Sequence, residues 1–422
     1  MGPELIFGQI FDQIGFSRIK EPLFRYLVMS RLIFPVSKLK TIDYLRRFNG
    51  TELEIDAVYR YPDKLHRDQM LYVQQIGYDH AIRVSGNGLT AVFYDVTTLY
   101  FEAEDEDDLR IAGFSKDGKH NQPQIVLGLL VNASSFPLAY QIFEGNKFEG
   151  HTMIPVLEAF KAKYKVKQLV VVADAGLMST KNVQQLSVAG YDFILAARIK
   201  NESEALKRQI LALRLPDGES TMIDRHDHKL IVSYSLKRAK KDAYNREKGI
   251  TRLEKLIKTG KLTKEQINNR GYNKFLKLKG QIEVVIDMTK CREDEKWDGL
   301  KGYATNTNLS KEVVITQYRQ LYTIEKTFRI SKTDLRIRPI YHYLQRRIES
   351  HICICFAACV LYKETERQLK ELRSTFSVEK VIDIVKTIFE ITVRMPHSNE
   401  KHTRLILKQE EQKALLSLFG QL

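Results

Sequence analysis

The chain has 422 residues, 43% hydrophobic and 28% charged, which is enough for two or three domains with sizeable cores. Its net charge of +15 and its pI of about 9.4 favour a polyanionic partner such as nucleic acid. The longest apolar run, residues 352–362, is too short to span a membrane, and no cleavable signal opens the chain. We therefore expect a cytoplasmic protein with no membrane partner.

Residues 1–88 are predicted to be helical. Apolar residues recur at helical spacing over residues 24–34, Pro35 ends that helix, and Ser37 is placed to cap the next one. Because the chain is basic and this region precedes the strands, we interpret it as a DNA-binding region.

From residue 89 the hydrophobic period changes to that of strands and helices in succession. Three strands come first, and a helix–strand–helix–strand series follows. This order predicts an α/β fold with a mixed sheet flanked by helices. The strands are predicted at 89–101, 123–132, 137–145, 168–176 and 191–198, and the helices at 151–164 and 179–190.

Residues 201–310 interrupt this pattern with an insertion in which strands are predicted at 229–235, 281–288 and 300–307. Residues 237–279 within it hold fifteen Lys or Arg and four acids, so most of the surplus charge is concentrated there. One interpretation is contact with a nucleic-acid backbone through cations such as Lys240 and Lys241. The other is a solvated helical hairpin on the surface.

Residues 318–343 are predicted to form an amphipathic helix with one carboxylate among many cations. Tyr318, Glu325 and Lys332 are spaced by seven residues, close to two helical turns, so they project from nearly one face. Residues 318–347 hold eight Lys or Arg and two acids. Such a helix suits a polyanion held beside a metal ion, although a solvated basic helix has the same pattern. A second, buried helix follows, and the chain is predicted to be helical from residue 366 to its end.

Two aspartates occupy equivalent positions, Asp95 after the apolar run AVFY and Asp174 after VVVA. A carboxylate at the end of a buried strand costs desolvation free energy unless it is paired or binds a metal. Together with Glu325 they would supply three oxygen ligands for one or two Mg²⁺ or Mn²⁺ ions. Two such ions could activate a nucleophilic oxygen and stabilise the leaving oxygen of a phosphodiester.

Four cysteines are too few for a disulfide framework in a chain of this length, which agrees with a reducing cytoplasm. Cys353, Cys355 and Cys359 lie in one apolar helical run. With His351 they could form a metal or redox site. We prefer the alternative, that they are small buried residues at a helix interface.

The segments FYDVTTLYFE, VVVADAG and Y-x6-E-x6-K resemble the three signatures of insertion-sequence DDE transposases. The group they resemble is bacterial and carries a tyrosine–arginine–glutamate–lysine motif and a β-rich insertion. The resemblance covers roughly residues 20–365. It implies an RNase H-like core split by the insertion, with Asp95, Asp174 and Glu325 as the metal-binding, catalytic triad.

By the same resemblance, Tyr318 and Lys332 would contact phosphates near the cleavage site. The motif has an arginine three residues after its tyrosine, where this chain has Leu321; Arg319 and Arg329 are the candidates to replace that contact. Further DNA contacts are expected at two lysines of the segment GFSKDGKHN, Lys116 and Lys119. Trp297 either stacks on an unpaired base or is a half-buried aromatic of the insertion.

The resemblance implies a Mg²⁺-dependent transposase that cuts the ends of its element and joins them to target DNA. Its partners would be double-stranded DNA, at terminal repeats and target, and a second copy in a synaptic complex. Two alternatives are a nuclease of the same fold that does not join strands and a non-catalytic end-binding protein. The expected division begins with a DNA-binding region at residues 1–88. The catalytic core follows in two parts, residues 89–200 and 311–365, which are separated by the insertion at residues 201–310. A helical tail at residues 366–422 ends the chain.

Overall fold

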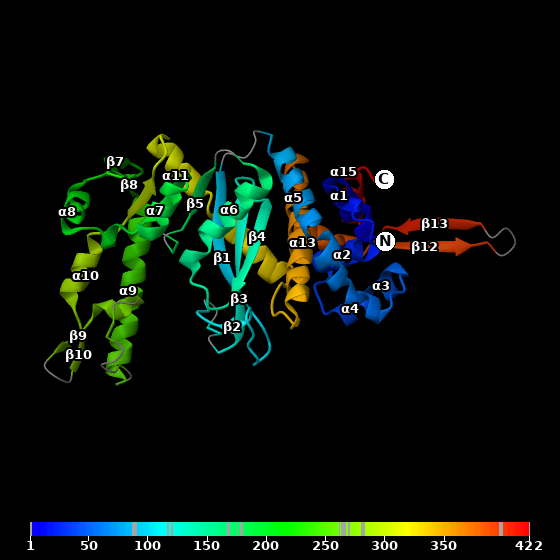
Figure 1. Ribbon diagram of the computed structural model, residues 1–422, viewed down its shortest axis with the longest axis horizontal. Helices are drawn as coiled ribbons and strands as arrows, with labels where there is room; N and C mark the ends of the chain where they lie inside the picture. Colours follow the sequence, from blue (N-terminus) through cyan, green and yellow to red (C-terminus); the bar gives the residue numbers. More distant parts are fainter. Residues whose placement is uncertain are drawn as a thin grey trace. The chain divides into compact units, whose positions relative to one another are not determined.

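The structure is a computed structural model that describes residues 2–86, 91–115, 118–119, 121–166, 169–174, 176–177, 180–260, 262, 267–268, 271–279, 283–395 and 400–421 (Figure 1). The chain divides into two compact units. Unit 1 combines Met1–Val172 with Gln320–Leu422, and unit 2 is Ala173–Arg319.

The sheet of unit 1 is built around β1 (Ala91–Tyr100), which pairs antiparallel with β3 (Pro123–Asn132). The other edge of β3 pairs with β2 (Ile111–Ala112) and β4 (Pro137–Glu144). β5 (Val170–Ala173) is the neighbour of β1 on its other side. All ten residues of β3 are buried, as expected of a strand in the middle of a covered sheet. The predicted strands are therefore present.

Helices cover both faces of this sheet. The Tyr94 hydroxyl of β1 donates to Thr152, at the start of α6 (Met153–Tyr164), so Tyr94 faces α6. On the other face, Tyr140 of β4 contacts Phe356 of α13 (Gln345–Glu371), with ring centroids 5.3 Å apart. The predicted α/β architecture, a mixed sheet flanked by helices, is confirmed.

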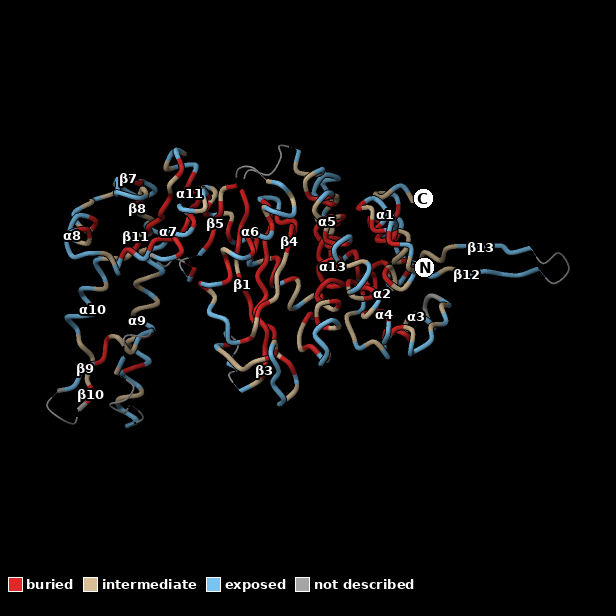
Figure 2. The backbone as a smooth tube through the Cα atoms, viewed as in Figure 1, coloured by how far each residue is buried: buried red, intermediate tan, exposed pale blue. Residues whose placement is uncertain are grey.

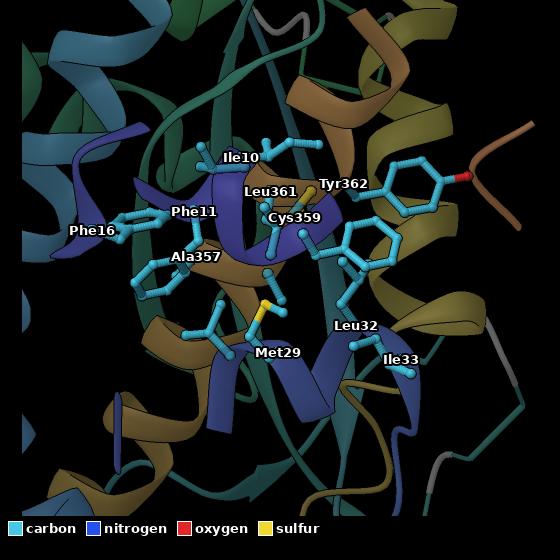
Figure 3. Packing of buried hydrophobic residues seen from close by; sticks show 14 of the residues in the cluster. Ile10, Phe11, Phe16, Met29, Leu32, Ile33, Ala357, Cys359, Leu361 and Tyr362 are labelled. Atoms are coloured by element: carbon cyan, nitrogen blue, oxygen red, sulfur yellow. The ribbon is translucent and has the colours of Figure 1, made fainter. Parts of the chain in front are cut away.

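The N-terminal region is helical, as predicted, and the Ser37 side chain caps its helix by accepting from the backbone N–H of Lys40. Its helices pack against α13 to form the main apolar cluster of unit 1 (Figure 3). In that cluster Phe11 and Phe16 of the N-terminal region meet Ala357 and Leu361 of α13. The helical elements of this region are η1 (Glu4–Gly8), α1 (Gln9–Ile14), η2 (Phe16–Arg18), α2 (Pro22–Ile33), α3 (Lys38–Asn49), α4 (Ile55–Lys64), η3 (Leu65–Gln69) and α5 (Met70–Ser85).

The C-terminal tail differs from the prediction of helix to the end. Between α14 (Val378–Val385) and α15 (Glu410–Leu418) the chain forms a hairpin of β12 (Phe389–Arg394) and β13 (Lys401–Ile406). The sequence FEITVR alternates apolar and polar residues, which is the period of a strand. The helical prediction was therefore wrong over these residues.

The strands of unit 2 pair in the order β6-β11-β8-β7, and β9 and β10 form a separate two-stranded sheet. Adjacent strands are antiparallel. The predicted basic helical stretch, residues 237–279, is only partly an α-helix: its first part lies in the long helix α9 (Leu236–Lys258), most of whose residues are exposed (Figure 2). Its last nine residues form η7 and β9 instead, so the helical interpretation was wrong there. The other elements are α7 (Thr180–Val188), β6 (Asp192–Ala197), η5 (Ile199–Asn201), α8 (Glu204–Ala212), β7 (Ser220–Asp224), β8 (Lys229–Tyr234), η7 (Gly271–Phe275), β9 (Leu276–Lys279), β10 (Glu283–Ile286), α10 (Met288–Glu295), β11 (Leu300–Thr305) and α11 (Lys311–Arg319).

The predicted single helix from Tyr318 is instead broken. α11 ends at Arg319, and α12 (Tyr322–Arg329) begins after a turn and continues as the π-helix η8 (Ile330–Asp334). No Pro or Gly lies in residues 311–334, so local propensity does not explain the break. Each half instead buries its apolar residues in the core of its own unit, α11 against β6 and β11, and α12 against β1.

Candidate active site

Asp95 is the fifth residue of β1, in the middle of the strand. The predicted strand at 89–101 is present, but the interpretation of Asp95 as a strand-end residue was wrong, because pairing with β3 continues to Tyr100. Its register partner is Leu129 of β3, whose partner on β4 is Tyr140. Directly opposed residues share a face, so Asp95 lies on the face that α13 covers. It is half-buried, and its Oδ1 accepts a hydrogen bond from the backbone N–H of Val96 at 2.8 Å.

Glu325 lies on α12, which packs directly against β1. Ile324 and Phe328 are buried, whereas Glu325 is exposed. The helix is held from both sides. The Thr327 hydroxyl donates to the backbone carbonyl of Ser135 at 3.4 Å, and an ion pair joins Lys326 to Glu366 of α13. Unit 1 therefore presents two carboxylates, those of Asp95 and Glu325, on elements that contact each other.

Asp174 directly follows β5, as predicted for a carboxylate at a strand end, and it is exposed. Its Oδ1 accepts a hydrogen bond from the hydroxyl of Tyr318 at 3.0 Å. The Tyr318 residue is only 5% exposed, and its ring packs edge-on against Tyr303 with Lys301 Nζ 4.2 Å from its centroid. Tyr318 thus orients the Asp174 carboxylate, a role that the sequence did not indicate.

Lys301 and Tyr303 were missed as neighbours of the site. The signal was present, because they alternate along β11 and therefore share one face of that strand. The ammonium group of Lys301 is attracted to the negative face of the Tyr318 ring, and this contact helps to hold the tyrosine that donates to Asp174.

The predicted DNA contacts fall into separate places. Arg319 ends α11 and Arg329 ends α12, and both are exposed, whereas Lys332 in η8 is half-buried. Lys240 and Lys241 are exposed on α9. The remaining two are Lys119, whose Nζ lies 5.4 Å from the Tyr100 ring centroid, and Lys116, which is outside the described residues.

Leu321 stands where the motif has an arginine, and it is 6% exposed. It occupies the turn between α11 and α12 with its side chain in the protein interior. A buried leucine cannot donate a hydrogen bond to a phosphate, so Arg319 and Arg329 stay the candidates for the contact that the motif predicts.

The sequence matches the family described as "Transposase DDE domain" over residues 86–361. The chain belongs to this transposase family. The match includes Asp95, Asp174 and Glu325 and the whole of unit 2. The α/β architecture agrees with the RNase H-like fold of such transposases.

Solved structures similar to this transposase include the cryo-EM structure of a piggyBac transposase synaptic complex with hairpin DNA. That similarity has a TM-score of 0.44 and 9% sequence identity, and it covers 86% of this chain and 68% of the other. No curated protein matches the chain.

Transposase DDE domains generally use divalent metal ions. The predicted donor set of three carboxylates fits Mg²⁺ or Mn²⁺, which prefer oxygen ligands. The hydrogen bond from Tyr318 occupies one acceptor position of Asp174, and a carboxylate has about four. Within the described ranges, no three His, Cys, Asp or Glu side chains form a group that could hold a metal ion. Asp95 and Glu325 belong to unit 1 and Asp174 to unit 2, so their convergence stays a prediction.

The cysteines of α13 are buried and free, in agreement with a role in helix packing. Burial raises the pKa of Cys353 to about 12 and that of Cys355 to about 11, which keeps both thiols protonated at neutral pH. Trp297 is half-buried in unit 2. Among the helices that the structure describes, none has the length and apolar character to cross a membrane.

Proposed function

We propose that this protein is a DNA transposase that cuts the ends of a bacterial insertion sequence and joins them to target DNA. The observation that carries the proposal is the family match over residues 86–361, a range that contains all three residues of the predicted triad. The packing of α12 on β1 adds support, because it brings the elements of Asp95 and Glu325 together. We assign the protein to the group with the tyrosine–arginine–glutamate–lysine motif, from which it departs at Leu321.

In this proposal Asp95, Asp174 and Glu325 hold one or two Mg²⁺ or Mn²⁺ ions beside the scissile phosphate. When bound, such ions lower the pKa of an attacking oxygen and offset the charge that develops on the leaving oxygen. The half-buried position of Asp95 within a paired strand fixes one ligand to rigid backbone. Tyr318 fixes a second by its hydrogen bond to Asp174.

DNA binding is assigned to cations outside the triad. The exposed lysines of α9, Lys240 and Lys241 among them, would contact duplex phosphates. Arg319, Arg329 and Lys332 would contact phosphates near the cleavage site, and Lys116 and Lys119 would add further contacts. An element has two ends, and cutting both in one event requires two active sites, so we propose a homodimer in the synaptic complex. The expected location is the bacterial cytoplasm, with the protein bound to the nucleoid.

The test uses a duplex that contains an end of the element with its flanking DNA. The full-length protein is expected to nick the duplex at the end with Mg²⁺ and not with EDTA. With an added target plasmid it is expected to form joined products. Nicking without joining would identify a nuclease, and binding without metal-dependent nicking would identify an end-binding protein.

A further inference from the structure

A groove in unit 1, distinct from the triad, carries a strong positive charge. Its volume is about 780 Å³, and it lies between the α2–α3 corner and the segment that leads from η8 to α13. We call it the basic groove. Its cations are Arg31, Lys38, Lys40, Arg336, Arg338 and Arg347.

The walls of the basic groove are fixed by backbone contacts. The backbone N–H of Ile340 donates to the Tyr100 carbonyl of β1 at 3.3 Å, and Ile337 and Ile340 are buried. Across the groove, Arg31 donates to the carbonyls of Leu335 and Arg336 at 3.5 and 3.4 Å. The cations are therefore presented by elements that are already ordered, which lowers the entropy cost of binding.

No Asp or Glu is among the described residues that line the basic groove. Asp63 lies nearby and pairs with Arg347 at 2.8 Å, but it also accepts from Arg346. The described lining of the groove therefore carries six cations and no carboxylate of its own. A concave surface of one sign attracts an anion of the other sign, and phosphate is the common anion that arginine forks bind.

The surplus of positive charge in the basic groove affects the protonation of Lys38 and His342. Its Nζ lies 2.6 Å from Nε2 of His342. Burial, together with the charges of Lys38 and Arg347, lowers the pKa of His342 to about 3, so the imidazole is neutral and accepts this hydrogen bond. Burial, with the neighbouring charges of Arg31 and Arg347, lowers the pKa of Lys38 to about 8. An anion in the groove would relieve this repulsion between cations.

Three exposed tyrosines also line the basic groove. Tyr341 is 69% exposed, Tyr343 60% and Tyr59 40%. Arg110 lies 5.2 Å from the Tyr343 ring centroid, and Lys38 Nζ lies 5.6 Å from that of Tyr59. Exposed rings among cations are the arrangement that binds unpaired nucleic acid, because bases stack on the rings while phosphates contact the charges.

We propose that the basic groove binds an unpaired stretch of DNA, with its phosphates on the groove arginines and lysines and its bases stacked on Tyr341 and Tyr343. That the strand is DNA rests on the proposed function, whereas the stacking and the phosphate contacts rest on the groove itself. A duplex fits less well, because its base faces are hidden within the stack and could not reach exposed rings.

The first experiment measures binding of fluorescein-labelled oligothymidylate by fluorescence anisotropy, without metal. The double variant Tyr341→Ala/Tyr343→Ala is expected to bind at least about tenfold more weakly, since it removes two stacked bases and each contributes about fivefold or more. Tyr341→Phe/Tyr343→Phe keeps both rings and should bind like the parent. Tyr72→Ala is the matched control, because Tyr72 is another exposed tyrosine near an arginine, Arg18, and does not line the groove.

The second experiment measures the salt dependence of the same binding. Arg336→Gln/Arg338→Gln should lower the slope of log affinity against log salt concentration by roughly 0.7 for each single-strand phosphate that the protein no longer neutralises. Arg46→Gln/Arg47→Gln removes the same charge from the exposed face of α3, away from the groove, and should leave the slope unchanged.

Parent-like oligothymidylate binding by the double alanine variant would overturn the proposal. If the arginine variant lost affinity while the tyrosine variant kept it, the groove would contact phosphates without stacking on bases, and the proposal would also be overturned. Both outcomes are independent of cleavage. Failure of metal-dependent nicking with intact groove binding would count against the proposed transposase activity and leave the groove assignment standing.

Discussion

We define the α9 arm of unit 2 as Leu236–Glu295. Unit 1 and the α9 arm differ in how much packed structure surrounds their charged side chains. In unit 1 the carboxylates of the candidate site lie on β1 and α12, which pack against each other, and an ion pair between Lys326 and Glu366 joins α12 to α13. In the α9 arm the buried apolar cluster consists of Leu253, Phe275, Leu276, Val284 and Cys291, and the surface of α9 is mostly exposed. Catalysis requires groups held within fractions of an ångström, whereas counterion release requires only charge near DNA. The two regions therefore differ in the way that their proposed roles, metal-dependent chemistry in unit 1 and DNA binding in the α9 arm, would require.

The largest expected effect is on the stability of unit 1. Phe356→Ala removes the ring that packs on Tyr140 and should lower the free energy of unfolding by about 3–5 kcal/mol. Phe114→Ala, at a site that is 73% exposed, should change this free energy by less than about 0.5 kcal/mol.

Leu253→Ala should unfold the α9 arm locally and leave the main unfolding transition unchanged, as measured by urea unfolding and hydrogen exchange. If Leu253→Ala instead unfolded the whole chain, the arm would belong to one common core.

Glu325→Gln separates chemistry from binding. The change keeps size and polarity but removes one negative charge from the proposed metal site, and nicking with Mg²⁺ should fall about 100- to 1000-fold. Affinity for the duplex end, measured by gel shift, should be retained because it rests on cations elsewhere. Nicking at the parental rate would show that Glu325 is not a ligand.

The third effect is a loss of unit 1 stability in acid. Burial of Glu364 opposes ionisation, but hydrogen bonds from Arg367, His80 and Gln368 outweigh it and lower the pKa of Glu364 to about 2. The unfolded chain has the higher pKa, so this stabilisation is present above about pH 4.5 and is lost as pH falls towards 2. It amounts to on the order of 3 kcal/mol. Glu364→Gln should flatten this part of the stability profile, whereas Glu371→Gln, an exposed partner of the same Arg367, should leave it nearly unchanged.

Tyr318→Phe tests whether this tyrosine positions Asp174 or contacts DNA. Removing the hydroxyl loses a hydrogen bond to a charged group, which is worth about 1.5–3 kcal/mol. We expect kcat for nicking to fall about tenfold or more, with the KM for the duplex unchanged. A rise in KM at constant kcat would assign Tyr318 to DNA binding instead.

The smallest effect is expected on the α9 arm. Lys240→Gln/Lys241→Gln should weaken duplex binding roughly fivefold per contact near physiological salt and lower the salt slope by about 0.9 per contact. Lys380→Gln/Lys386→Gln removes equal charge from exposed sites of unit 1 and serves as the control. Equal weakening in both variants would mean that only net charge matters, and the distinction between the two regions would fail for binding.

The sequence by itself determined the α/β architecture, because strand and helix periods are local properties of the chain. Ten-residue strands such as β1 and β3 follow from runs rich in apolar, β-branched and aromatic residues, and the Ser37 cap follows from one side chain. The three triad candidates and the basic α9 could also be found by residue type and spacing alone. None of these features depends on a partner that is distant in the chain.

Only the tertiary structure decided the features that depend on which surfaces meet. The break between α11 and α12 has no local signal and follows from burial in two separate cores. The face of β1 that carries Asp95 lies towards α13, as its register with Leu129 and Tyr140 shows. The Tyr318 hydroxyl donates to Asp174, which is 144 residues away in sequence. The basic groove lies where α2 and α3 meet the segment before α13. Period and propensity cannot encode such contacts, because they arise from packing between residues that are far apart in the chain.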